Sequence, residues 1–135
     1  MTDRVRLATV SDAVQIVDAA IAYCKATGQP CEVESVHDSV FKVLTEPQYR
    51  VFVLPGRAHC ILAISASMYD NSHTIARIVS TWGDGGLRVL RHALDWCKAH
   101  EVHEVIADTH LEPRIAKWYA RQGFAPVGQL FQRTL

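Results

Sequence analysis

The sequence predicts a mixed α/β fold, in which one sheet combines antiparallel and parallel strands. Several short runs of β-branched residues alternate with polar ones, other segments carry apolar residues at helical spacing, and glycine or proline stands at most boundaries. The order expected from these runs is β-α-α-β-β-β-α-β-α-β. Because no repeat, linker or low-complexity stretch divides the 135 residues, we expect a single domain over residues 1–135.

The beginning of the chain is expected to form one strand and two helices. Residues 5–10 alternate apolar with polar side chains, as half-buried strands do. Two amphipathic segments follow, each opened by a capping residue and closed by glycine or proline. They predict a helix over residues 12–28 and a shorter one over residues 37–46.

The middle of the chain is expected to form three consecutive antiparallel strands. Two β-rich runs, residues 49–54 and 59–68, flank the turn signal Pro55-Gly56 and predict a hairpin. After a turn at Asp70-Asn71-Ser72, residues 73–80 alternate again and predict the third strand.

The last part of the chain alternates helices with strands. The glycine-rich residues 83–86 open a helix, and residues 102–109 are a further strand. Residues 112–123 form a last helix, with a proline in its first turn and a glycine at its end. Two short runs, Pro126-Val127 and Leu130-Phe131, can supply a final strand or hairpin. A strand, loop, helix and strand in this order predict a right-handed parallel crossover.

Charge and composition argue against several classes of protein. Lys plus Arg and Asp plus Glu are both 14, so we expect neither nucleic acid nor a membrane as partner. The four cysteines form no C-x-x-C pair, and His100 and His103 do not share a face at ligand spacing, so no metal site is expected. A signal peptide and an apolar run of roughly 20 residues are both missing. We therefore expect a cytoplasmic protein with reduced thiols.

The order of elements and two segments resemble the GNAT superfamily of acyl-CoA-dependent N-acyltransferases, over nearly the whole chain. Residues 85–98 are similar to the helix that follows the family's pyrophosphate loop, and residues 112–124 to its late helix, which ends in the pattern Y-x-x-x-G-F. The resemblance implies the GNAT fold. It also implies an N-acetyltransferase that carries acetyl from acetyl-CoA, as cosubstrate, directly to an amine of a small molecule or protein.

Tyr119 occupies the tyrosine of that pattern. The resemblance implies that Tyr119 is the general acid that protonates the CoA thiolate as it leaves the tetrahedral intermediate. A phenol with a pKa of about 10 suits a leaving thiolate of somewhat lower pKa. The alternative is that Tyr119 is an aromatic residue at the edge of the core, beside Trp118.

The loop before the earlier helix departs from the family pattern [RQ]-x-x-G-x-[GA], whose backbone N–H groups enclose the CoA pyrophosphate. Thr81 stands where the family has Arg or Gln, and Asp84 replaces the first glycine. Arg88 or Arg91 could replace the lost arginine contact, and the alternative is that the glycines form a plain strand-to-helix turn. The residues expected to bind the cofactor lie on the strand, the loop and the first helical turn: Ile78, Val79, Ser80, Gly83, Gly85, Gly86, Leu87 and Arg88.

Many members of the family carry a Glu on the strand before the loop as general base, but residues 73–80 hold no carboxylate. The base is therefore expected after the next parallel strand. Asp108 lies where active-site residues gather in such sheets, and His110 has an intrinsic pKa suited to a base near neutrality. The alternatives are that Asp108 caps the loop and that His110 is solvated. His59 and Cys60 are neighbours in a strand, so they point to opposite faces and cannot form a catalytic pair.

Two other functions stay open on the sequence. The altered loop fits a GNAT-like binding or structural protein without cofactor, and short, divergent proteins of that kind occur in bacteriophages. A generic α/β domain outside the family is the other. Family members often pair through edge strands, so a homodimer is possible. Four residues are candidates to line the acceptor pocket: Tyr23, Glu32, Glu34 and Tyr69.

Overall fold

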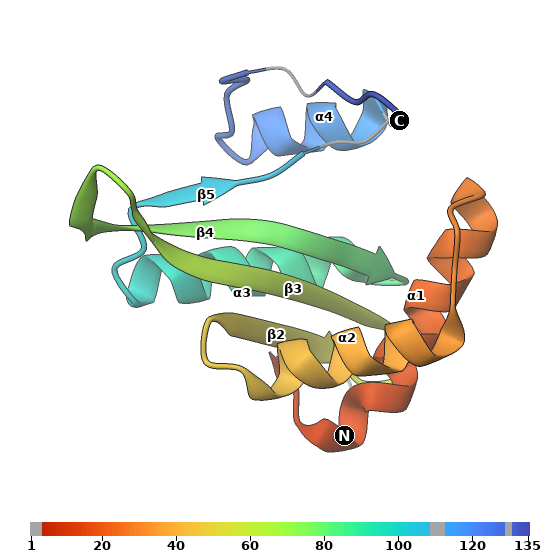
Figure 1. Ribbon diagram of the computed structural model, residues 1–135. Coiled ribbons are helices and arrows are strands. Elements are labelled where there is room, and N and C mark those ends of the chain that lie inside the picture. The colour runs from red at the N-terminus through yellow and green to blue at the C-terminus, as the bar shows by residue number, and fades with distance from the viewer. Residues whose placement is uncertain (1–3, 109–112, 129–130) are drawn as a thin grey trace.

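The computed structural model describes residues 4–108, 113–128 and 131–135, which form a five-stranded sheet with helices on both faces (Figure 1). Its strands follow one another across the sheet in chain order, antiparallel from β1 to β4, with β5 parallel to β4. They are β1 (Arg6–Leu7), β2 (Tyr49–Leu54), β3 (Ala58–Ser67), β4 (Asp70–Gly83) and β5 (Glu104–Ile106). The mixed α/β class that the sequence predicts is confirmed.

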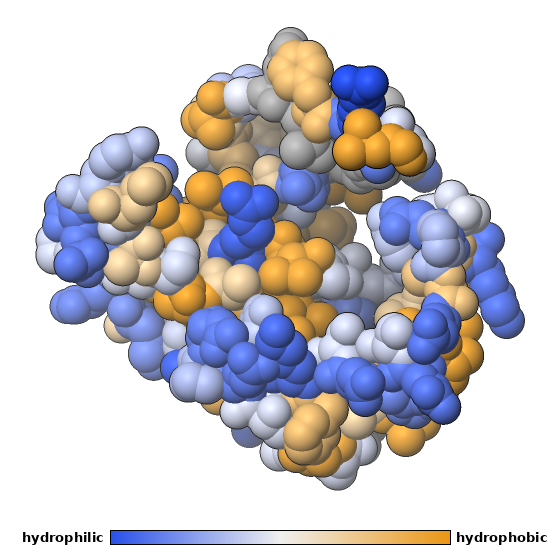
Figure 2. Space-filling view, viewed as in Figure 1, coloured by the Kyte–Doolittle hydropathy of each residue, from blue (hydrophilic) through white to orange (hydrophobic). Residues whose placement is uncertain are grey.

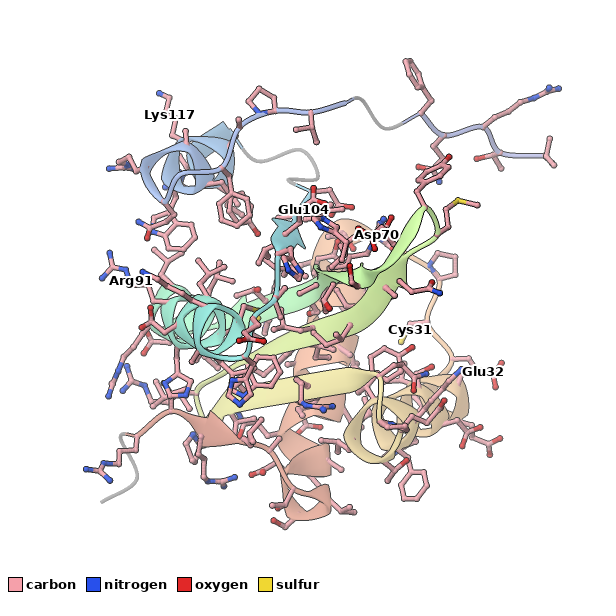
Figure 3. All side chains as sticks on the ribbon, turned by 90° about the vertical axis from the view of Figure 1, so that its left-hand side faces the viewer. Cys31, Glu32, Asp70, Arg91, Glu104 and Lys117 are labelled. Atoms are coloured by element: carbon pink, nitrogen blue, oxygen red, sulfur yellow. The ribbon has the colours of Figure 1, made fainter. Side chains whose placement is uncertain are left out.

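The helices lie in two layers, one on each face of the sheet. Their bounds are α1 (Ala13–Thr27), α2 (Val33–Thr45), α3 (Gly86–Ala99) and α4 (Pro113–Arg121), with a short 3-10 turn η1 (Val10–Asp12) before α1. Figure 3 shows α3 and α4 on one side of the strands and α2 on the other. We call the two sides the α1 face and the α3 face.

Side-chain alternation along the strands divides the core between these faces. On β2, Val51 and Val53 pack in the cluster of α1 and α2, whereas Phe52 and Leu54 pack in the cluster of α3. The α3 cluster also contains Trp118 and Tyr119 of α4, so Tyr119 packs on the α3 face.

The first strand is shorter than its alternation predicts. β1 covers Arg6–Leu7 only, because the chain turns at Thr9 into η1. Asp12 holds this turn: its carboxylate accepts hydrogen bonds from the Thr9 backbone N–H at 2.8 Å and from the Arg6 guanidinium at 2.8 and 2.9 Å. The guanidinium holds the pKa of Asp12 below its ordinary value. Asp12 is therefore an ion-paired anchor as well as a helix-starting residue.

Other expectations also differ from the structure in extent. Of the strand expected over residues 102–109, β5 covers Glu104–Ile106, and Thr109 lies outside the described residues. The second helix begins at Val33, before residue 37, and β4 continues three residues beyond Ser80. The final strand of the expected order does not occur within residues 124–128 or 131–135, and Gln129 and Leu130 lie outside the described residues. Val127 and Phe131 are 91% and 85% exposed, so neither of these two side chains is buried against the sheet.

Candidate functional site

β4 and β5 pair over three residues and then part. Ile75, Ala76 and Arg77 face the three residues of β5, which ends at Ile106, while β4 continues to Gly83. The separation therefore begins at Ile78, the first of the three strand residues expected to bind the cofactor. The C-terminal half of β4 consequently presents an edge that has no β5 partner.

Contacts at the other end of β4 fix β5 in place. The imidazole of His73 bonds to the carboxylate of Glu104 and stacks on the ring of His103 at 4.9 Å between centroids. The backbone of Thr74 both receives an N–H from His103 at 2.9 Å and donates to its Nδ1 at 3.0 Å. Figure 3 shows Asp70 and Glu104 close together at this end. The strands are thus held at one end and diverge at the other.

A β-bulge lies on β4 where the separation begins. Ser80 faces Ile61 and Ile78 faces Leu62, so Val79 is an extra residue without a partner on β3. The bulge reverses the alternation: Ile78 packs on the α3 face, whereas Ser80 shares the α1 face with Ile61. The three strand residues expected to bind cofactor thus present groups to both faces and to the open edge.

The loop between β4 and α3 packs tightly against the β2–β3 turn. At Gly83, φ is +104° and a Cβ would lie 2.1 Å from the carbonyl oxygen of Arg57. A residue with a side chain would therefore collide with backbone there, so packing alone requires this glycine. Asp84 is 86% exposed in its side chain, and its carboxylate lies 3.2 Å from the Arg57 guanidinium. The negative charge that replaces the family's glycine therefore has a cationic neighbour.

The start of α3 borders a basic depression of about 910 Å³. It is lined by Arg4, Val5, Gly85, Leu87, Arg88, Arg91, His92 and Asp95. Three of these residues are arginines and one is an aspartate, and Figure 3 shows Arg91 pointing outward from α3. Three predicted cofactor residues, Gly85, Leu87 and Arg88, thus share one surface, whereas Gly86 lies next to the Thr81 side chain.

Tyr119 is buried on the α3 face, with 8% of its surface exposed. Its ring packs edge-on against Trp118 at 5.6 Å and lies 5.0 Å from that of Phe124. Burial raises the pKa of Tyr119 to about 12, and unfavourable electrostatic interactions of the phenolate with Cys60 and Asp108 add to this. The structure therefore brings Tyr119 and Asp108 into electrostatic contact and also places Tyr119 beside Trp118, as the core-edge alternative requires.

The Y-x-x-x-G-F pattern has a structural explanation in the end of α4. The Phe124 N–H donates to the carbonyl of Tyr119 at 3.0 Å, and the Gly123 N–H to that of Ala120 at 3.1 Å. Gly123 has a φ of +92°. Together with the ring contact between Tyr119 and Phe124, this is a Schellman motif. The pattern therefore fixes the rotation of the Tyr119 ring as well as the end of the helix.

Asp108 and His110 are the two predicted bases. Asp108 follows β5 and is exposed. His110 lies outside the described residues. Glu112, at the start of the last predicted helix, does so too.

The structure adds a pair that the sequence reasoning missed. His59 of β3 is 3% exposed, and its Nε2 lies 3.1 Å from the hydroxyl oxygen of Ser80 on β4. Burial lowers the pKa of His59 to about 4. The pairing depends on the register across a bulge, so no local sequence signal predicts it.

The candidate acceptor residues are not all near this pair. The ring of Tyr23 on α1 meets the edge of Trp82 on β4 at 5.6 Å, and Trp82 is the β4 partner of His59. Tyr69 lies in the turn at the opposite end of β4 and is 91% exposed. Glu32 and Glu34 stand at the start of α2, and both are exposed. Among the described residues, Tyr23 is thus the one of these four candidates for which the structure shows a contact with a residue of the site.

No protein-family model and no curated protein sequence matches the chain. Solved structures do match it along nearly its whole length. The BH1408 protein of Bacillus halodurans, as a tetramutant, superposes with a TM-score of 0.79 at 16% identity, covering 98% of this chain and 99% of that one. A "putative acetyltransferase" of Agrobacterium tumefaciens gives 0.77 at 19% identity, covering 98% and 99%. The chain has the GNAT fold.

A third match of this fold is an aminoglycoside acetyltransferase from an uncultured soil metagenomic sample, in complex with trehalose. Its TM-score is 0.71 at 13% identity, and the match covers 98% of this chain and 95% of that one. In this chain, Tyr119 packs on the α3 face of the sheet. The side chains of His59 and Ser80 meet on the α1 face, at the open half of β4.

Within residues 4–108, 113–128 and 131–135, no helix has the length and apolar character needed to cross a membrane. The same ranges hold no group of three His, Cys, Asp or Glu side chains arranged to bind a metal ion. All four cysteines are free.

Proposed function

We propose that this protein is an N-acetyltransferase that transfers acetyl from acetyl-CoA directly to an amine. The observation that carries the proposal is the open half of β4 in a chain with the GNAT fold. Its unpaired edge begins at Ile78, which packs in the same core cluster as Tyr119. An extended pantetheine arm can add to such an edge as a strand would, through backbone hydrogen bonds. Ile78, Val79 and Ser80 are the residues proposed to provide them.

In this proposal the phosphates of the cofactor bind at the N-terminus of α3. The N–H groups at a helix N-terminus attract anions. Residues 83–86 lead directly into the N-terminus of α3. The arginines of the depression, Arg4, Arg88 and Arg91, add the positive charge that the altered loop lacks. The basic side chains thus compensate for the exposed carboxylate of Asp84.

Tyr119 is proposed as the general acid. In the reaction the amine nitrogen bonds to the thioester carbon, the carbon–sulfur bond breaks, and the thiolate takes the proton of the phenol. A pKa of about 12 keeps that phenol protonated at neutral pH but makes it a weaker acid than an ordinary tyrosine. The proton therefore passes to sulfur as the carbon–sulfur bond breaks and negative charge develops there. Asp108 is the proposed acceptor of the proton that the nitrogen loses after attack, and His110 is the other candidate.

A second function is favoured by one observation. The tight contact of Gly83 with Arg57 explains the loop without any ligand, as expected for a GNAT-like binding or structural protein that has no cofactor. Calorimetric titration with acetyl-CoA decides between the two. Binding that Arg91→Gln weakens and Lys25→Gln, a matched change on α1, leaves unaltered supports the transferase. No heat and no thermal shift at millimolar acetyl-CoA would support the cofactor-free protein.

A further inference from the structure

The side chains of His59 and Ser80 have no role in the mechanism above, yet they meet at the open half of β4. Ser80 is half-buried and stands one residue beyond the bulge, where β5 no longer covers the strand. Its hydroxyl lies 3.1 Å from His59 Nε2. Tyr119 packs on the opposite face of the sheet. An amine at Ser80 and a leaving thiolate at Tyr119 would therefore approach the strand from opposite faces.

The charge state of His59 limits what this pair can do. Burial lowers the pKa of His59 to about 4, so the ring is neutral at pH 7. A neutral imidazole with its proton on Nδ1 accepts a hydrogen bond at Nε2, and the Ser80 hydroxyl is placed to donate it. The oxygen of Ser80 then has its lone pairs left to accept an N–H from another molecule. Such a pair orients an amine well but is a poor base.

The strands around Ser80 hold no carboxylate that would balance a cation. Neither β2 nor β3 contains an Asp or Glu, and residues 77–83 of β4 contain none. Two titratable side chains shown on this face are His59 from β3 and Tyr23 from α1. Asp108, the proposed proton acceptor, interacts with Tyr119, which packs on the opposite face. A protonated amine would lose hydration here without gaining an ion pair.

Aromatic side chains form the next part of the same face. Trp82 is the cross-strand partner of His59 and lies two residues beyond Ser80 along β4. Tyr23 packs edge-on against its ring at 5.6 Å between centroids. Figure 2 shows the surface hollowed over the C-terminal half of β4, between the end of α1 and the last part of the chain. Planar aromatic compounds make favourable offset or edge contacts with such rings.

We propose that the acceptor is a weakly basic aromatic amine, which binds uncharged on the α1 face with its amino group donating a hydrogen bond to Ser80, whose hydroxyl is positioned by His59. This inference rests on the proposed function. The neutral nitrogen attacks the thioester carbon, and its surplus proton leaves to Asp108 or to water. The phenolate of Tyr119, having given its proton to sulfur, recovers one from water. The products are the amide and free CoA, so atoms and charges balance.

Two acceptors that share a phenyl ring test the charge requirement. Aniline is neutral at pH 7, whereas benzylamine is largely protonated. We expect aniline to give at least tenfold higher kcat/KM at pH 7 and a rate independent of pH between 7 and 9. The benzylamine rate should rise about tenfold per pH unit as its neutral form appears. A benzylamine rate that equals or exceeds that of aniline at pH 7 and does not change with pH would overturn the inference, because a protein base would then be removing the proton.

Variants test the two side chains. Ser80→Ala should lower kcat/KM for aniline at least tenfold, and Ser80→Thr, which keeps the hydroxyl, should restore most of it. His59→Gln keeps a hydrogen-bond acceptor for Ser80 and should retain activity, whereas His59→Leu should behave as Ser80→Ala does. Activity of Ser80→Ala within twofold of wild type contradicts the role of Ser80.

Calorimetry separates this inference from the proposed function. His59→Gln and His59→Leu should bind acetyl-CoA with wild-type affinity, since His59 is not among the residues proposed to bind the cofactor. If wild type binds acetyl-CoA but prefers benzylamine, the inference alone fails. If wild type binds no acetyl-CoA, the proposed function fails and the inference fails with it.

Discussion

The backbone N–H of Phe124 donates a 3.0 Å hydrogen bond to the carbonyl of Tyr119, and the two rings lie 5.0 Å apart. This relationship joins the end of α4 to the orientation of the proposed catalytic phenol. It depends on Gly123, whose φ of +92° lets the chain turn back. The motif that most resembles the family is thus also what holds Tyr119 in place.

Gly123→Ala should destabilise the fold by about 1–2 kcal/mol, because an L-residue is strained at this φ although a Cβ would meet no atom within 4 Å. Urea denaturation measures the free energy of unfolding. The control is Gly128→Ala, which also meets no atom and has no left-handed φ, and it should change the free energy by less than about 0.5 kcal/mol. Equal effects of the two changes would contradict the Schellman explanation.

Tyr119→Phe should lower kcat for acetyl transfer by about 10²-fold while leaving the affinity for acetyl-CoA unchanged, because it removes the proton but keeps the buried ring. Steady-state kinetics and calorimetry on the same preparation measure the two quantities. Tyr49→Phe, the same change at a tyrosine that packs against the cluster of α1 and α2, is the control and should retain full activity. Full activity of Tyr119→Phe would mean that the tyrosine is a core-edge aromatic.

Asp108→Asn should move the pKa of Tyr119 downward from about 12 toward its ordinary value of 10.0. The negative charge of Asp108 disfavours the phenolate, so its removal makes ionisation easier. Ultraviolet titration of phenolate, with the Tyr119→Phe variant subtracted, reports this group alone. An unchanged or higher pKa in Asp108→Asn would show that the two side chains do not interact.

Gly83→Ala should destabilise the protein more than Gly56→Ala does, by about 2 kcal/mol or more. Both glycines have φ in the left-handed region, but a Cβ at Gly83 would lie 2.1 Å from the Arg57 carbonyl oxygen, whereas one at Gly56 meets no atom within 4 Å. The difference between the two variants therefore isolates the collision. Thermal unfolding of both proteins, at one pH, provides the comparison.

Stability should fall on acidification between pH 6.5 and 4 through His59. Its pKa is about 4 in the folded chain, against 6.5 for an unperturbed histidine, so the unfolded chain binds more protons in this range. Burying His59 uncharged stabilises the fold, and this stabilisation is fully present above pH 6.5. It is lost as the pH falls from 6.5 to 4, and the loss is on the order of 3 kcal/mol of the free energy of unfolding. His59→Gln should show a flatter profile. Parallel profiles would contradict a buried neutral histidine.

The sequence alone determined the class of fold and the sequential order of most elements. Alternation in residues 49–54 and helical spacing after residue 83 are local properties that follow from the periods of strand and helix. The Tyr119 to Phe124 pattern is local too, since a Schellman motif spans six residues. These parts could therefore be predicted without tertiary contacts. The final strand could not, because residues 126–127 are apolar yet lie exposed.

Only the tertiary structure decided which groups meet. The bulge at Val79 sets the face of Ser80, and long-range register then brings His59, twenty-one residues earlier, within 3.1 Å of it. Gly83 is required by a collision with Arg57 that no neighbour in sequence reveals. The shift in the pKa of Tyr119 likewise arises from burial and from Asp108. Such properties depend on distances through space, and a sequence records only distances along the chain.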